Sequence, residues 1–341
     1  VASTLGLATS DKSFMDGSTN LVFERADADT ATVQNLGSLR ASGGPVVLMG
    51  AGVSNEAGGS IVADGHTVAL ASGRKITLDL AGDGLTNIAI TADSLASKAS
   101  AANSGTLQAD GGRVVMVGQS TTLNELVVNQ AGTVRARSVG LRNGEIVLGA
   151  GGENDVRIGG TLDATGTARA GGRIDVSAGR VRVENATLDA SGDTAGGTVQ
   201  VRANAGLALA PGVIVRADGR AGNAAGGEIR LGATDMESSL DGMHLSGTLS
   251  ANGAGSGAGG LVSVGATAVA VGSDLAVSAS GGAGGGATGR WELRSGRQLI
   301  VSKDGPAYDP TNFFDGVGAG SSQVHGGAIG AAPAATRSVA G

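Results

Sequence analysis

The chain has 341 residues, of which 63 are glycine, 2% are aromatic and none is cysteine. This composition excludes a core built on large rings, a disulfide framework, thiol catalysis and cysteine-based zinc sites. The formal net charge of −6 disfavours nucleic acid as a partner, and no apolar run approaches the roughly 18 residues of a membrane span. We therefore expect one elongated repeat domain with no membrane span and no nucleic-acid partner.

A five-residue unit, [Leu/Ile/Val]-x-Ala-[Asp/Ser/Thr/Asn]-Gly, recurs at intervals typical of stacked supersecondary units. Its alternation predicts a short half-buried strand with the aliphatic residue and the alanine inward. The polar residue is expected to hydrogen-bond to the local backbone and the glycine to adopt a positive φ, so that the chain turns sharply. The copies begin at Leu39, Ile61, Leu107, Leu162, Leu188, Val215, Leu249 and Val277, with a degenerate copy at Val134.

Alternating aliphatic runs predict two further strands in each coil. The second is expected at 46–48, 68–70, 114–116, 174–176, 199–201, 229–231, 262–264 and 291–293, and the third at 156–158, 181–183, 207–209, 269–271 and 299–301. Three parallel strands per coil predict an all-β fold, a right-handed parallel β-helix (solenoid). The expected product is a monomeric rod on the order of 50 Å long, with Trp291 pointing inward in its last coils.

Two stretches interrupt the repeat. Alternating runs at Ile76–Leu80 and Leu85–Ile90, on either side of Gly-Asp-Gly, predict a hairpin or strand pair outside the helix near its amino-terminal end. After Gly305, prolines, glycines and alanines predict a loosely ordered tail.

Residues 1–90 resemble the haemagglutination-activity (two-partner secretion) domain of filamentous-haemagglutinin-type exoproteins from Gram-negative bacteria. The resemblance is carried by Val1-Ala-Ser-Thr-Leu5, Phe14-Met-Asp-Gly17, Leu21-Val-Phe23, Asn35-Leu-Gly-Ser-Leu39 and Ile76-Thr-Leu-Asp-Leu-Ala-Gly-Asp-Gly-Leu85. The later Gly-Thr-Leu-x-Ala repeats resemble the family's following β-helix.

The repeat pattern and this resemblance together divide the chain into three parts, and the resemblance implies two partners. Residues 1–104 correspond to the amino-terminal part of the domain, 105–305 to continuing β-helix repeats and 306–341 to a Gly/Ala/Pro-rich flexible tail. The implied partners are an outer-membrane barrel transporter of the two-partner secretion type and a host-cell surface glycan or protein receptor. The family's Asn-Pro-Asn-Gly-type motifs do not occur, so the chain is expected to begin inside the domain.

Candidate catalytic and metal-binding groups are few. Asp64, Asp110 and Asp218 occupy turns, where Ser, Thr or Asn replaces them in other copies, so local hydrogen bonding explains them better than catalysis or calcium binding. Asp79 and Asp83 form the nearest acid pair, in the extra strands. His66, His244 and His325 lack metal-ligand spacing and are expected to face solvent. We expect no catalytic residue, metal or cofactor.

Arginines offer the one candidate binding surface. An outward basic stripe for sulfated or acidic glycans is predicted from Arg169, Arg173, Arg180 and Arg182, preceded by Arg135, Arg137 and Arg142. The alternative is that Asp163, Asp175 and Glu184 pair with these arginines. The leading hypothesis is a non-enzymatic adhesin rod, secreted or surface-exposed outside the outer membrane. The alternatives are the stalk or secretion module of a toxin-delivery exoprotein and a β-helix polysaccharide-degrading enzyme.

Overall fold

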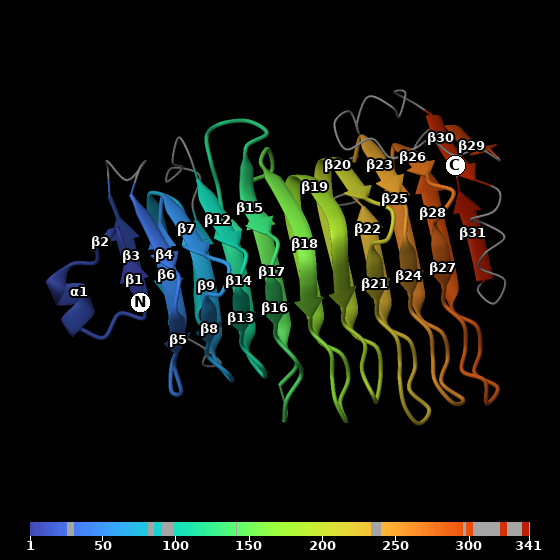
Figure 1. The fold of residues 1–341 in the computed structure, drawn as a ribbon, viewed down its shortest axis with the longest axis horizontal. Helices are drawn as coiled ribbons and strands as arrows, with labels where there is room; N and C mark the ends of the chain where they lie inside the picture. The colour runs from blue at the N-terminus through green and yellow to red at the C-terminus, as the bar shows by residue number, and fades with distance from the viewer. Residues whose placement is uncertain are drawn as a thin grey trace.

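The chain folds as a three-sided parallel β-helix, whose successive coils lie side by side along the long axis of the molecule (Figure 1). The computed structural model describes residues 1–25, 31–80, 85–90, 99–140, 142–232, 240–295, 298–302, 321–325 and 336–340. Each full coil adds one strand to each of three parallel sheets, which we call faces A, B and C in chain order. The predicted fold class is confirmed.

Most strands lie entirely within a single face, whereas three long strands continue around a corner from one face to the next. Face A contains β4 (Thr32–Asn35), β7 (Gly52–Asn55), β12 (Ser100–Asn103), β15 (Leu126–Gln130), β23 (Gly242–Leu245) and β26 (Ala268–Val271). Face B contains β5 (Ser38–Arg40), β8 (Ser60–Val62), β13 (Thr106–Gln108), β16 (Thr133–Arg135), β21 (Ile214–Arg216), β24 (Thr248–Ser250) and β27 (Ala276–Ser278). Face C contains β1 (Ala2–Ser3), β6 (Val46–Gly50), β9 (Thr67–Ser72), β14 (Arg113–Gly118), β17 (Glu145–Ala150), β22 (Glu228–Gly232), β25 (Leu261–Ala266), β28 (Arg290–Ser295) and β31 (Thr336–Ala340). The corner-turning strands are β18 (Asp155–Asp163), which spans faces A and B; β19 (Arg173–Asp189), which spans all three; and β20 (Thr198–Leu209), which spans faces C and A.

The interior is a column of aliphatic side chains contributed by all three faces. Leu107 and Ala109 of the five-residue unit are fully buried, as the alternation predicts. Trp291 is 2% exposed and belongs to the same core, which confirms its predicted inward position. Because every coil buries the same kind of residue, the hydrophobic stabilisation is spread along the rod.

A four-stranded antiparallel sheet covers the outside of face C at the amino-terminal end. Its order is β11 (Asn87–Ile90), β10 (Lys75–Asp79), β3 (Asn20–Glu24) and β2 (Gly6–Leu7), and the short helix α1 (Asp11–Met15) lies between β2 and β3 in sequence. Ile76 and Leu78 are buried against the outward side chains of β6 and β9, such as Met49. The extra-helical strand pair expected near 76–90 is therefore confirmed.

The carboxyl-terminal region fits the repeat less simply. The third strand expected at 299–301 falls in β29 (Gln298–Ser302), which pairs with β30 (Ser321–His325) rather than continuing face A directly. β31 continues face C by pairing with β28. Most of the predicted flexible tail, 306–341, lies outside the described residues.

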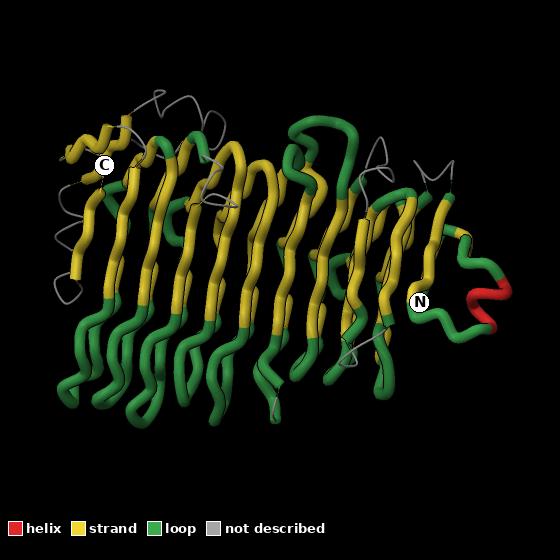
Figure 2. Tube along the Cα trace, turned by 180° about the vertical axis from the view of Figure 1, so that it is seen from behind, coloured by secondary structure: helices red, strands yellow, loops and turns green. Residues whose placement is uncertain are grey.

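Glycines in the turns between faces B and C serve two purposes, and only one was expected. Gly65 adopts a positive φ of 74°, as predicted. At Gly192 the φ is not positive, and the reason for glycine is close approach: a Cβ there would lie 2.1 Å from the backbone nitrogen of Gly171. The later turns stack directly on one another through bridges such as Gly166 to Gly192, and they project as a row of loops along one edge of the rod (Figure 2).

Candidate interaction surfaces

The four arginines of the predicted basic stripe are not brought together on one face. Arg173 begins β19 on face C, whereas Arg180 and Arg182 lie further along β19 on face A. Arg169 is exposed in the turn from face B to face C. The strand turns a corner between these positions, so a run that is continuous in sequence is divided among separate surfaces.

Three of these four arginines form ion pairs, two of them with carboxylates that the alternative interpretation named, Asp175 and Glu184. Arg173 Nη2 lies 2.6 Å from Asp175 Oδ2, and Arg180 donates two bonds to Asp155, of 2.8 and 2.7 Å. The contact from Arg182 to Glu184 is longer, at 3.9 Å.

The preceding arginines contact acceptors in other coils. Arg135 donates to both carboxylate oxygens of Asp110, at 3.1 and 2.6 Å, and Arg142 donates to the carbonyl of Gly65 at 3.2 Å. Arg137 donates to Asp163 at 2.8 Å. Burial would raise the pKa of Asp163, but hydrogen bonds from Arg137 and Thr165 outweigh it and lower that pKa below its ordinary value.

The predicted turn carboxylates accept hydrogen bonds from the next coil and not from their own turn. They are Asp64, Asp110 and Asp218. Asp64 Oδ1 accepts the backbone N–H of Asp110 at 3.0 Å, and Asp110 Oδ1 accepts that of Arg137 at 3.1 Å. Asp218 Oδ1 accepts the N–H of Asn252 at 2.6 Å. The expectation of local bonding was wrong here because equivalent turns lie one strand spacing apart, which brings the next coil's N–H within reach.

Local bonds are found at the equivalent positions Thr165 and Ser191. Arg137 has no acceptor atom in its side chain, and the N–H of Thr165 in the following copy instead bonds to Asp163, at 3.1 Å. The N–H of Ser191 likewise donates to Asp189 Oδ1, at 2.8 Å. These carboxylates are thus occupied by turn hydrogen bonds, which is a structural role.

The predicted acid pair and histidines are only partly described. Asp79 lies in β10, in register with Asn87 and Asn20, while Asp83 lies outside the described residues. His66 is half-buried and its Nδ1 lies 3.0 Å from the carbonyl of Asp64.

His244 corrects the expectation that the histidines face solvent. It lies in β23 and is 3% exposed, with Nε2 3.1 Å from Ser246 Oγ. Its register neighbours are Ala208 and Ala270, and both are also buried. Burial lowers the pKa of His244, and the charge of Asp274 acts weakly in the opposite direction.

A buried amide ladder at the corner between faces A and B was missed from the sequence. Asn35 donates to Asn55 at 2.7 Å, Asn55 to Asn103 at 2.8 Å and Asn103 to Gln130 at 2.8 Å. Asn103 and Gln130 are fully buried. The available signal was an asparagine or glutamine a few residues before the five-residue unit in successive coils. This signal is hard to recognise because the distance from the amide residue to the unit varies between coils.

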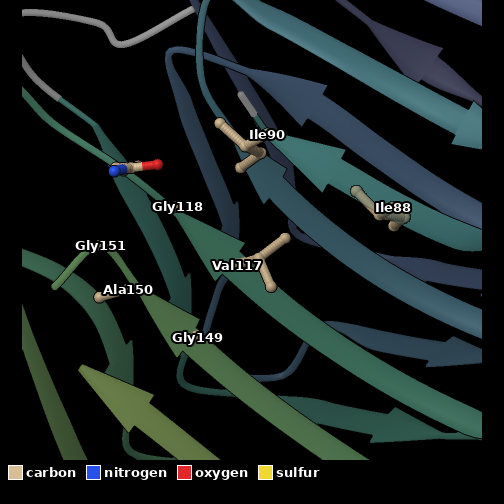
Figure 3. Close-up of a pocket in the computed structure, with 8 residues that line it drawn as sticks. Ile88, Ile90, Val117, Gly118, Gly149, Ala150 and Gly151 are labelled. Atoms are coloured by element: carbon tan, nitrogen blue, oxygen red, sulfur yellow. The ribbon is translucent and has the colours of Figure 1, made fainter. Parts of the chain in front are cut away.

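A pocket of about 180 Å³ lies where the extra-helical sheet ends against face C (Figure 3). Strands β11, β14 and β17 form it, and Ile88 and Ile90 project from β11 over Val117. The lining residues are Ile88, Ile90, Val117, Gly118, Gln119, Gly149, Ala150 and Gly151. Gln119 is the only lining residue with a polar side chain, so the pocket contains no side chain for acid–base chemistry.

No cluster of three or more His, Cys, Asp or Glu side chains able to hold a metal was found among the residues the structure describes. Within the same part of the chain, no helix is long and apolar enough to cross a membrane.

The comparisons with known proteins show a structural likeness. No protein-family model matches the chain, and no curated protein matches its sequence. Among solved structures, the fold is similar to the crystal structure of the HMW1 secretion domain from Haemophilus influenzae, with a TM-score of 0.64 and 24% sequence identity. The match covers 86% of this chain and 73% of that chain. This likeness establishes the shared fold, and membership in the filamentous-haemagglutinin-type family stays a prediction.

Proposed function

We propose that this chain is a secretion-domain segment of a two-partner secretion exoprotein. An outer-membrane barrel transporter exports it, and it is presented outside the outer membrane of a Gram-negative bacterium as a non-enzymatic adhesive rod. The observation that carries this proposal is the extra-helical sheet laid on the first coils of a parallel β-helix, together with the likeness to the HMW1 secretion domain over 86% of the chain.

The chemistry of the described surface supports a binding role over catalysis. The turn carboxylates of Asp64, Asp110 and Asp218 accept hydrogen bonds from the next coil, and Asp155, Asp175 and Glu184 pair with arginines. Glycan hydrolysis requires a close pair of carboxyl groups free to act as acid and base or nucleophile. A rigid rod with charged rows on its sides instead offers a host-cell glycan or protein an extended surface.

Export is tested by producing the exoprotein that carries this chain in a Gram-negative host, with and without its two-partner transporter. Antibody against the chain then measures how much protein reaches the medium and the outer surface. We expect external protein only when the transporter is present. Equal external amounts without the transporter would contradict the proposal.

A matched pair of variants tests whether the extra-helical sheet is needed. Ile76→Asp places a charge against the buried side of this sheet and is expected to reduce the folded external protein. Thr77→Asp places the same charge on the next residue of β10, whose side chain is partly exposed, and is expected to leave export near the parental level.

A further inference from the structure

Face C changes its outward character along the rod. In the first coils its outward positions are apolar, for example Met49 and Ala71, and the antiparallel sheet buries them. From β19 onward most outward positions are charged, polar or glycine, although Leu261 of β25 also occupies an outward position. This second half contains Arg173, Asp175, Arg202, Glu228, Arg230, Arg290, Glu292 and Arg294.

Two groups within this half each place two arginines on one carboxylate. Asp175 contacts Arg173 at 2.6 Å and Arg202 at 2.7 Å. Glu292 contacts Arg294 at 2.8 Å and also Arg290. One carboxylate neutralises one guanidinium, so each group retains a positive charge. With Arg230 paired to Glu228, this surface is net positive on a chain whose total formal charge is −6.

The two groups flank a flat strip of backbone. Arg202 is in register with Gly232, and Gly265 is in register with Arg294, while a Cβ on Gly232 would lie 2.8 Å from the carbonyl oxygen of Gly265. Arg202 and Arg294 are thus three strand spacings apart, about 14 Å. Only Gly232 and Gly265, which have no side chains, lie between Arg202 and Arg294 along this row. Ser263 lies beside the strip in β25.

We propose that this arginine–glycine surface, formed by Arg202, Gly232, Ser263, Gly265 and Arg294, binds a linear anionic polysaccharide along the rod axis. Acidic groups of the polymer pair with Arg202 and Arg294, and the sugar rings between them lie on the glycine strip. Guanidinium groups suit sulfate and carboxylate because they offer paired, fixed donors. The inference deepens the proposed attachment role by naming the class of ligand.

A polysaccharide fits this surface better than single-stranded nucleic acid. Proteins that bind single strands combine a strongly basic groove with aromatic side chains on which bases stack. None of the outward residues of this surface is aromatic, and its charge excess is small. Nucleic acid therefore serves as a competing ligand in the test.

The test measures equilibrium binding of the purified full chain to four fluorescent polymers: heparin, polygalacturonate, neutral dextran and single-stranded DNA. We expect saturable binding to heparin or polygalacturonate that weakens with salt, and none to dextran. Heparin alone would identify sulfate as the preferred group, and binding of both would show that carboxylate suffices. Binding of neither, or tighter binding of DNA, would overturn the proposal.

Two variants locate the site. Arg202→Gln with Arg294→Gln is expected to weaken binding about tenfold or more. The charge-matched control, Arg157→Gln with Arg182→Gln on face A, is expected to change it less than about twofold. Gly265→Val alters no charge, and the structure has room for its Cβ, whose nearest neighbour would be Arg294 Cβ at 4.0 Å. Because the valine side chain obstructs the glycine strip, this variant is expected to weaken binding several-fold. Equal losses in the face A control would overturn the proposal.

This experiment separates the failure of the inference from failure of the proposed function. Transporter-dependent export without polysaccharide binding would leave the secretion proposal standing and remove the ligand. Polysaccharide binding by a chain that is not exported through the transporter would support the ligand and contradict the secretion proposal.

Discussion

Side chains in the turns connect coils through individual hydrogen bonds, and the clearest example is Asp218. Its two carboxylate oxygens accept from the backbone N–H of Asn252 and the hydroxyl of Ser250 in the next coil, at 2.6 and 2.8 Å. Asn252 repeats the arrangement with Ser280 and Ser278. An amide thus replaces a carboxylate in the same role, so the role depends on an acceptor oxygen and not on charge.

Replacing Asp218 separates a structural role from a catalytic or cation-binding one. Asp218→Ala leaves the Asn252 N–H without its acceptor and is expected to lower the free energy of unfolding by about 1–3 kcal/mol. Asp218→Asn retains an acceptor and is expected to cost much less. Urea unfolding followed by circular dichroism measures both variants. If the asparagine variant loses as much stability as the alanine variant, the negative charge matters and the structural interpretation is wrong.

His244 makes stability depend on pH. Because burial lowers its pKa below 6.5, the unfolded chain binds more protons than the folded chain as the pH falls through this value, and stability therefore decreases toward acid. His244→Gln removes this contribution. We expect the urea midpoint of the parent to fall more than that of the variant between about pH 7.5 and about pH 5.5. Equal decreases would show that His244 is not buried in its neutral form.

Among the elements, the stacked turns between faces B and C place the strictest demand on the sequence. Gly192 lies so close to the preceding turn that a Cβ would come within 2.1 Å of the backbone nitrogen of Gly171, and within 2.3 Å of the carbonyl oxygen of Ala195 in its own turn. Backbone atoms cannot rotate away as a side chain can, so two coils must separate to admit a methyl group.

Gly192→Ala is accordingly expected to destabilise the rod by about 3 kcal/mol, the upper end for overpacking. The control is Gly43→Ala, in an earlier turn where a Cβ would meet nothing within 4 Å and where no stability loss is expected. Thermal unfolding of both variants measures the difference. A Gly192→Ala variant as stable as the control would mean that the turns are not in contact.

A strand was predictable from sequence where the alternation of its own residues is enough to identify it. Alternation in Leu107-Gln-Ala109 identified a face B strand, and the run at 76–80 identified β10, because each pattern reports burial on one side of a single strand. The Asn55–Asn103 contact joins residues 48 apart, and no local pattern reports which coil lies against which. The amide ladder was missed for that reason.

At the scale of the whole molecule, sequence neighbours within a coil lie on different faces, while spatial neighbours on one face come from successive coils. Arg173 and Arg182 are close in sequence but belong to faces C and A, whereas Arg202 and Arg294 share face C across four strands. The predicted arginine stripe therefore divided into separate surfaces. Candidate binding surfaces on such a rod can be assembled only after the register of its coils is known.

Attachment by the folded rod is the central claim, and binding of coated beads to cells tests it most directly. Beads coated with the folded chain are incubated with epithelial cells and red cells, and matched beads carry heat-denatured chain. We predict saturable binding by the folded form alone, because the outward rows of a β-helix exist only while its coils are stacked. Absence of binding by the folded form, or equal binding by both forms, would contradict the account.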